Sequence, residues 1–173
     1  MSARRALLLG ALGLLSACGL RPLYGGDEGN PAGGAPGGVR GDLAAIKIAT
    51  IAERGGQVLR NALLDHLTPE GEPAQPLYQL AVTRSESEET PLRRLDEVAM
   101  LQILRVGASW SLRDLSGATL TAGVSRTLAR FDLTRSQPAT DAARENARER
   151  AARDLAEDIR VKLALYFRQR RGL

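Results

Sequence analysis

A stretch of ten residues near the middle of the chain alternates strictly between apolar side chains and polar or small ones, and this pattern constrains the fold most. Leu104, Val106, Ala108, Trp110 and Leu112 alternate with Arg105, Gly107, Ser109, Ser111 and Arg113. Because successive side chains of a strand point to opposite faces, the pattern predicts a strand with one buried and one solvated face. The chain therefore has to build a sheet that is covered on one side only.

Three other segments are predicted to be strands. They cover residues 43–51, 77–84 and 118–124, where alternating or β-branched apolar residues are bounded by Gly, Pro or Asp. The last of these continues toward Leu133 with its phase flipped, which predicts a bulge at residues 125–127. The polar residues 85–97 are predicted to form a solvated loop.

Two segments have the three- and four-residue apolar spacing of amphipathic helices. They cover residues 57–67 and 138–167. The opposite-charge pairs Glu149/Arg153 and Asp158/Lys162 are four residues apart on the second helix. Its buried stripe is predicted to be Ala147, Ala151, Leu155, Ile159, Leu163 and Tyr166. The order β-α-β-β-β-α predicts an α+β fold, a two-layer α/β sandwich with a four-stranded mixed sheet and two helices on one face.

The N-terminus predicts export and lipidation. Arg4 and Arg5 precede an apolar run that is typical of a secretory signal, and this run is shorter than the roughly 20 residues of an independent membrane anchor. The motif LSAC ending at Cys18 has the form of a lipobox, so residues 1–17 are expected to be a signal peptide and Cys18 the lipidated residue. An ordinary signal with an incidental cysteine is the alternative. Residues 18–42 are then the lipidated N-terminus and a Gly/Pro-rich tether, of which residues 25–41 span roughly 20 to 25 Å, and residues 43–173 are a single domain.

The composition argues against most kinds of chemistry. One Cys and one His are too few for the usual zinc sites, and 3% aromatic residues are too few for a stacking pocket. His66 and Asp65 are helix neighbours that do not face each other, so a surface histidine is expected and not a catalytic pair. Glu86, Glu88 and Glu89 lack the spacing of a calcium loop. We therefore expect no metal, no cofactor and no enzymatic activity.

The net charge also bears on the partner. It is +4 for the whole chain and falls to +2 when the signal peptide, with Arg4 and Arg5, is removed. An exported protein with this small charge is not expected to bind nucleic acid.

Three segments of the chain resemble one known family. The opening CGLRPLYGG from Cys18, the segment GQVLRNALLDHL from Gly56 and the segment ARERAARDLAEDIRVKLALYF from Ala147 are similar to the LptE family of lipopolysaccharide-assembly lipoproteins, of the alphaproteobacterial type. The element order matches the α/β sandwich of that family. The resemblance therefore covers nearly the whole mature chain.

The resemblance implies a role without catalysis. Members of this family are anchored in the periplasm-facing leaflet of the outer membrane, plug the LptD β-barrel, help it assemble and help deliver lipopolysaccharide. The expected partners are therefore an LptD-like barrel, lipopolysaccharide and the membrane that holds the lipid anchor.

Two other functions are alternatives to this one. A lipid-anchored carrier of amphiphiles needs an apolar-lined interior, whereas the strand phases predict a filled core. A lipid-anchored hydrolase needs a Ser/His/Asp or paired-carboxylate site, which no pattern in the sequence supplies.

Strand alternation selects the residues most suited to contact a partner. Trp110 is predicted to lie in the core, and the polar residues that alternate with it lie on the solvated face. Guanidinium groups match phosphate geometry, although ordinary surface arginines are the alternative. The candidate contacts with the barrel or lipopolysaccharide are Arg105, Arg113, Ser109, Ser111, Arg93 and Arg94.

Overall fold

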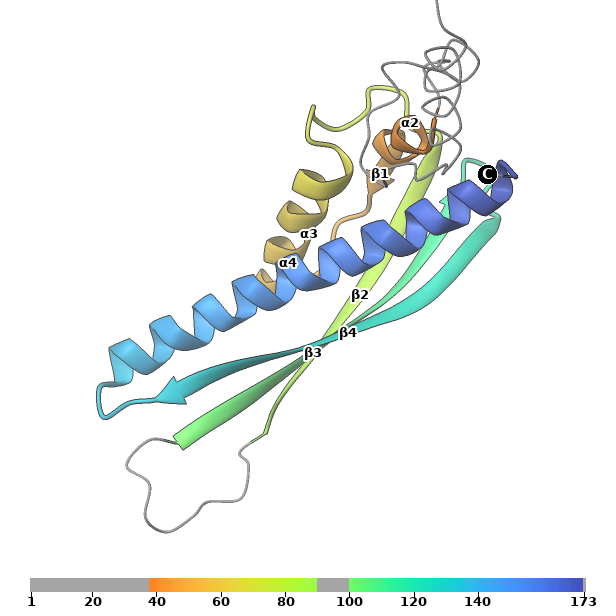
Figure 1. Cartoon of the computed structure of the whole chain (residues 1–173). Coiled ribbons are helices and arrows are strands. Elements are labelled where there is room, and N and C mark those ends of the chain that lie inside the picture. Colours follow the sequence, from red (N-terminus) through yellow and green to blue (C-terminus); the bar gives the residue numbers. More distant parts are fainter. Residues whose placement is uncertain (1–37, 90–99, 173) are drawn as a thin grey trace, which may run out of the picture. The chain divides into compact units, whose positions relative to one another are not determined.

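The computed structural model describes residues 38–89 and 100–172, and these form one compact unit (Figure 1). Its strands are β1 (Ile46–Ile48), β2 (Tyr78–Glu89), β3 (Met100–Asp114) and β4 (Thr119–Leu133). Its helices are α2 (Val39–Ala44), α3 (Arg54–Leu67) and α4 (Gln137–Arg170). No helix in the described ranges is both long and apolar enough to cross a membrane.

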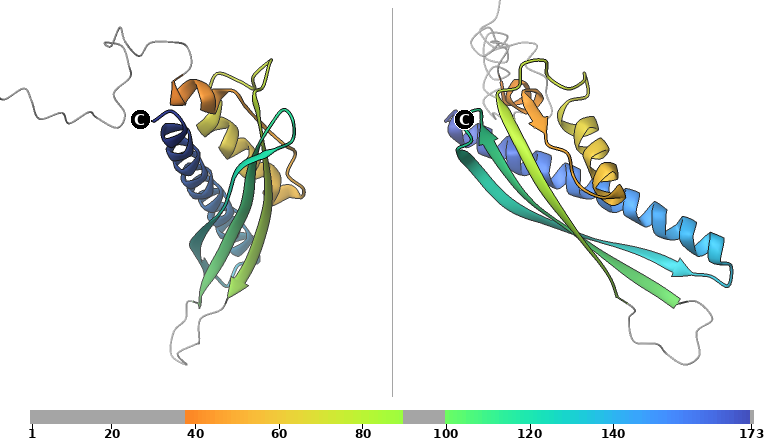
Figure 2. Two further views of the ribbon diagram at one scale, coloured as in Figure 1. Left: turned by 90° about the vertical axis from the view of Figure 1, so that its right-hand side faces the viewer. Right: turned by 180° about the vertical axis from the view of Figure 1, so that it is seen from behind.

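The four strands form one mixed sheet in the order β1-β2-β3-β4. Strand β1 pairs in parallel with β2, and α3 provides the crossover between them. Strands β2, β3 and β4 are antiparallel neighbours. Helices α3 and α4 pack on the same face of this sheet, which Figure 2 shows from two directions. The predicted α+β sandwich is confirmed.

Strand β3 has the predicted phase. Leu104, Val106 and Leu112 are almost fully buried beneath the helices, and Trp110 is only 6% exposed. The residues that alternate with them point away from the helices. The hydrophobic effect thus decides which face of the sheet the helices cover.

Helix α4 is longer than predicted but buries nearly the predicted stripe. Five of the six expected residues lie in the core, and the exception is Tyr166, which is half-buried. Phe167 takes the core position and packs against Tyr78 of β2, with ring centroids 5.1 Å apart. Because a helix turns by 100° per residue, a stripe followed over five turns drifts by one position.

The first strand, predicted over residues 43–51, is too long at both ends. Leu43 belongs to the short helix α2, and β1 has only three residues. A strand needs a hydrogen-bonding partner along its length, and β2 begins at Tyr78, opposite Ile46. Residues before Ile46 have no strand beside them, and Leu43 instead buries its side chain from a helical turn.

The loop predicted over residues 85–97 is wrong for residues 85–89, which continue β2. They pair with Ile103 to Gly107 of β3. Glu86 and Glu88 lie on the helix side of the sheet, where arginines of α4 neutralise them. Residues 90–97 lie in the part of the chain that the structure does not describe.

The bulge predicted at residues 125–127 is also wrong, because pairing with β3 is regular there. The register shifts instead at the start of β4, where Leu112 pairs with Thr121 and Arg113 pairs with Thr119. Leu120 is therefore the extra residue. This shift turns Val124 to the solvated face and Gly123 to the core.

Candidate functional site: the open face of the sheet

The sheet face opposite the helices is covered by no described element, and we call it the open face. Its middle part, on β2 and β3, consists of small and mostly polar side chains, and we call this part the floor. Its charged and larger residues lie toward the two ends of the strands. On β2, β3 and β4 the residues of this face include Thr83, Ser85, Ser87, Glu89, Leu101, Ile103, Arg105, Gly107, Ser109, Ser111, Arg113, Ala122, Val124, Arg126, Leu128, Arg130 and Asp132.

The structure places both predicted arginines on the open face but does not bring them together. Arg105 and Arg113 are eight residues apart on one strand, which corresponds to about 27 Å. Arg105 forms an ion pair with Glu89 of β2, with Nε and Oε1 2.6 Å apart. The hydrogen bond from Arg105 lowers the pKa of the Glu89 carboxyl below its usual range. Arg113 forms no ion pair with any residue that the structure describes.

Two more arginines on the open face were missed by the sequence reasoning. Arg126 and Arg130 lie on β4, and Leu128 between them pairs directly with Arg105. The three arginines therefore surround Leu128, with each β4 arginine diagonal to Arg105 at about 7 to 8 Å between Cα atoms. A bulge placed at Leu120 would have revealed the alternation of Arg126, Leu128 and Arg130. We call these three arginines the arginine cluster.

The floor between the arginine cluster and Arg113 is built of short side chains. Ser109 and Ser111 occupy its centre on β3, flanked by Thr83 and Ala122 on the neighbouring strands. These side chains are short, so a second backbone or a saccharide can approach closely and find hydroxyl donors and acceptors. Exposed apolar side chains adjoin the floor and the cluster, because Val124 is 45% and Leu128 52% exposed. The face thus offers hydrogen bonds, positive charge and some apolar surface.

The helix side of the sheet carries an internal ion-pair network at the end where β2 stops. Glu86 accepts hydrogen bonds from Arg84 and from Arg148 of α4, the latter at 2.8 and 2.9 Å. Burial raises the pKa of Glu86, but the bonds from Arg148 and Arg84 outweigh it and the pKa lies below its ordinary value. Glu88 pairs with Arg144 at 3.0 Å. These charges attach α4 to the sheet and are satisfied within the chain.

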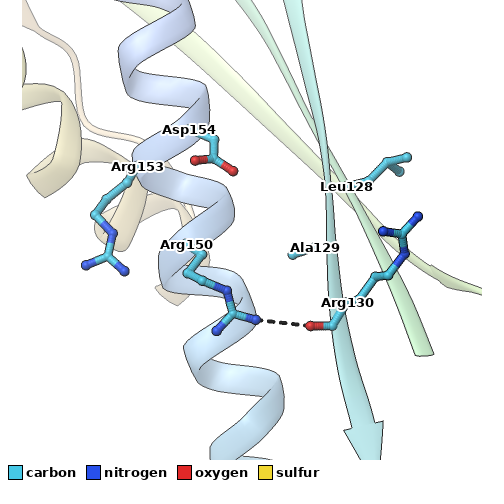
Figure 3. Close-up of a pocket in the computed structure, with 6 residues that line it drawn as sticks. All are labelled: Leu128, Ala129, Arg130, Arg150, Arg153 and Asp154. Carbon is cyan, nitrogen blue, oxygen red and sulfur yellow. Dashed lines mark hydrogen bonds between the residues drawn. The ribbon is translucent and has the colours of Figure 1, made fainter. Parts of the chain in front are cut away.

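A hollow lies between α4 and the free edge of β4 (Figure 3). Arg150 donates a hydrogen bond across it to the carbonyl oxygen of Arg130 at 3.0 Å. Ala129 points toward α4, whereas the side chains of Leu128 and Arg130 point away from it, toward the open face. About three turns further along α4, Lys162 donates a hydrogen bond to the carbonyl oxygen of Val124 at 2.9 Å. Long side chains of α4 thus occupy carbonyls that an edge strand would otherwise offer to another chain.

A second hollow lies where α3 begins, lined by Arg54, Gly55, Val58, Arg84 and other mostly charged residues. The guanidinium of Arg84 packs against Gly55, where a Cβ atom would lie 2.6 Å from Nη1. Neither hollow has the apolar lining that a carrier of amphiphiles needs.

The remaining candidate residues have ordinary roles or fall outside the description. Nδ1 of His66 lies 3.3 Å from Glu157 of α4, so this histidine joins the two helices and is not paired with Asp65. Cys18, Arg93 and Arg94 lie outside the described residues, and their predicted roles stay predictions.

Comparisons with known proteins bear on the class of the chain. No protein-family profile matches it, and no curated protein sequence matches it. A solved structure of a candidate lipoprotein from Caulobacter crescentus is 28% identical, with a TM-score of 0.62, and the match covers 75% of this chain and 95% of that one. A minor lipoprotein from Acinetobacter baumannii is 14% identical, with a TM-score of 0.54, and covers 69% of this chain and 90% of that one.

These matches place the described domain among bacterial lipoprotein folds. The first match spans nearly the whole of the solved Caulobacter chain, so the likeness concerns the complete domain and not a single motif. The second shows the fold alone. The chain is therefore similar to lipoproteins of bacteria, which agrees with the lipobox at its N-terminus.

Proposed function

We propose that this chain is a lipoprotein of the outer membrane that plugs an LptD-like β-barrel, helps that barrel assemble in the lipopolysaccharide export translocon and contacts lipopolysaccharide. It is anchored through Cys18 in the periplasm-facing leaflet and acts by binding, without catalysis. The observation that carries the proposal is the open face, a solvated sheet surface with four arginines on a domain of bacterial lipoprotein fold.

The open face suits the inside of a β-barrel. Barrel interiors are lined by polar and charged side chains, so a plug has to present hydrogen-bonding groups and complementary charge. The floor around Ser109 and Ser111 supplies hydrogen-bonding groups, and the arginine cluster and Arg113 supply the charge. The same face is polar enough to stay soluble before the barrel is present.

Lipopolysaccharide offers a second match. Its phosphates are anionic groups that guanidinium can bind with two parallel hydrogen bonds. The arginine cluster surrounds an exposed leucine, which places positive charge beside apolar surface, as an amphiphile with phosphates requires. Arg113, about 27 Å away along β3, is too distant to bind the same phosphate and is available for the barrel wall.

Charge reversal on the open face tests the proposal. Arg105→Glu with Arg113→Glu changes the net charge by four units without touching the core, and the domain should keep its fold. Like charges would then face acidic groups of the partner, so recovery of the barrel with the lipoprotein, or lipopolysaccharide at the cell surface, should fall.

A matched control makes the same change of charge outside the open face. Arg153 lies on α4 and Arg135 lies in the connection before it, and neither forms an ion pair with a described residue. Arg153→Glu with Arg135→Glu should leave both readouts at the level of the unmodified protein. If the open-face variant is folded, copurifies with the barrel and supports normal surface lipopolysaccharide, the open face is not the working surface and the proposal is wrong.

A further inference from the structure

One end of the domain gathers features that none of the contacts above explains. Helix α2, the start of β2, the turn between β3 and β4 and the last turn of α4 lie together at this end (Figures 1 and 2). Asp42 of α2 accepts two hydrogen bonds from Arg171 at the end of α4, at 2.7 and 3.0 Å. Tyr78 pairs with Asp114 and contacts Phe167. We call it the tether end, because the described chain starts here at Gly38.

Two large apolar side chains project from the tether end. Leu115 is 72% exposed and Leu77 is 53% exposed. Leu115 directly follows Asp114 and Leu77 directly precedes Tyr78, and Asp114 and Tyr78 are paired between β3 and β2, so both leucines lie at the same end of the sheet. The turn that presents Leu115 is held by hydrogen bonds that Asp114 accepts from Ser116 and from the backbone of Ala118. Leu77 is held by the hydrogen bond from its backbone N–H to the carbonyl oxygen of Ala45.

Uncompensated charge at the tether end is mainly positive. Arg113, Arg168, Arg170 and Lys47 form no ion pair within the described ranges. The acidic groups nearby are mostly paired, in ion pairs that join Asp42 to Arg171, Glu70 to Arg40 and Glu72 to Arg60. Asp114 is the exception, and the hydrogen bonds of its turn lower its pKa. Exposed leucines and unpaired arginines at one end of a domain are the composition of a surface that rests on anionic headgroups.

The length of chain outside the structure places this end near a membrane. Twenty residues separate Cys18 from Gly38. A Gly-rich chain of that length has a root-mean-square span of roughly 25 Å. If Cys18 is acylated, the tether end is therefore kept within a short distance of the bilayer surface.

We propose that the tether end docks on the phospholipid surface, with Leu77 and Leu115 inserted at the headgroup level and Arg168 and Arg170 beside lipid phosphates. The proposal rests on the lipid anchor of the proposed function. Docking would hold the tether end at the periplasmic surface of the membrane and leave the opposite end of the sheet, with the arginine cluster and the end of β2, free to lie inside the barrel. The lipid anchor would then supply attachment, and the tether end would supply orientation.

Flotation with vesicles tests the docking without the acyl chains. The chain from residue 18 onward, carrying Cys18→Ser, is mixed with vesicles of phosphatidylcholine alone or of phosphatidylcholine with phosphatidylglycerol. It should float with the anionic vesicles. Leu77→Ser with Leu115→Ser should lower the partition coefficient about ten-fold or more. Arg168→Glu with Arg170→Glu should lower it at least about thirty-fold, since each arginine near an anionic surface contributes roughly five-fold.

Helix α4 and the turn before it supply a matched control. Arg153→Glu with Arg135→Glu makes the same charge change outside the tether end and outside the open face, and it should leave flotation nearly unchanged. Urea midpoints and near-ultraviolet circular dichroism check that every variant is folded. The proposal is overturned if the parent chain does not float with anionic vesicles, or if the Arg153/Arg135 variant loses as much binding as the Arg168/Arg170 variant. Failure of lipidation is detected separately by the mass of the mature protein, so the two proposals fail independently.

Discussion

Trp110 and Gly123 allow the packing of β3 on β4 to be tested quantitatively. The two residues are paired in the sheet, and the indole ring lies flat over Gly123. A Cβ atom at Gly123 would lie 2.6 Å from Cζ2 and 3.0 Å from Cε2 of the ring. The ring cannot move aside easily, because Nε1 donates a hydrogen bond to the buried Ser125 at 3.2 Å. Only glycine fits beneath it.

The magnitudes follow from this geometry. Gly123→Ala should cost about 1 to 3 kcal/mol in the unmodified chain, because it overpacks the site. Trp110→Ala should cost about 3 to 5 kcal/mol, because it leaves a cavity and removes the hydrogen bond from the indole to Ser125. When both are combined, the new methyl group faces the cavity, and Gly123→Ala should become neutral or stabilising by about 0.5 to 1 kcal/mol. The expected coupling energy is therefore about 2 kcal/mol or more.

Urea denaturation of the two single variants, the double variant and the parent measures this coupling. Ser109→Ala, on the open face of the same strand, serves as the control and should change the unfolding free energy by less than about 0.5 kcal/mol. If Gly123→Ala costs the same with and without the tryptophan, the ring does not lie on Gly123 and the register of β4 is wrong. If Ser109→Ala costs as much as Trp110→Ala, the assigned face of β3 is wrong.

Two other predictions concern charge and lipidation. Glu86→Gln should destabilise the domain by about 1 to 3 kcal/mol at pH 7, because Arg84 and Arg148 lose their partner. The folded-state pKa of Glu86 is lowered from 4.5, so its stabilisation is present above that value and is lost as the pH falls through the lower folded-state value. The urea midpoints of the parent chain and of Glu86→Gln, measured from pH 7 to pH 3, should therefore converge at low pH. A difference between the two midpoints that does not depend on pH would contradict the ion-pair network. Cys18→Ala should leave the precursor uncleaved and without acyl chains, as mass spectrometry would show, whereas an unmodified thiol in the mature parent protein would refute lipidation.

Strong local patterns predicted the elements that carry most of the core. The alternation from Leu104 to Leu112 needed no knowledge of its neighbours, since one buried face imposes the phase on the strand. The apolar spacing on α4 likewise predicted the buried residues of that helix without knowledge of its neighbours. The exception is Phe167, which lies in the core where Tyr166 was expected. The order of the elements then determined the two layers.

Features that depend on a partner elsewhere in the chain could not be read in this way. Residues 85–89 are polar on both faces of the strand, so no apolar alternation marks them. They pair with β3, and Arg144 and Arg148, some sixty residues later, neutralise the glutamates that this pairing turns toward the helices. The bulge at Leu120 was misplaced because Ala122 and Val124 are apolar yet face water, which hid the change of phase. Arg126 and Arg130 were therefore missed, although they complete the open face with Arg105.

Photo-crosslinking from the open face in intact cells tests the central claim most directly. A photoreactive residue at Ser109 lies at the middle of the open face, and one at Glu149, on the exposed side of α4, serves as the control. Ultraviolet irradiation, purification under denaturing conditions and mass spectrometry identify the crosslinked partner. The account predicts that the Ser109 probe captures an outer-membrane β-barrel of the LptD type, or lipopolysaccharide, in higher yield than the Glu149 probe. Capture of neither from Ser109, in a protein that is folded and lipidated, would contradict it.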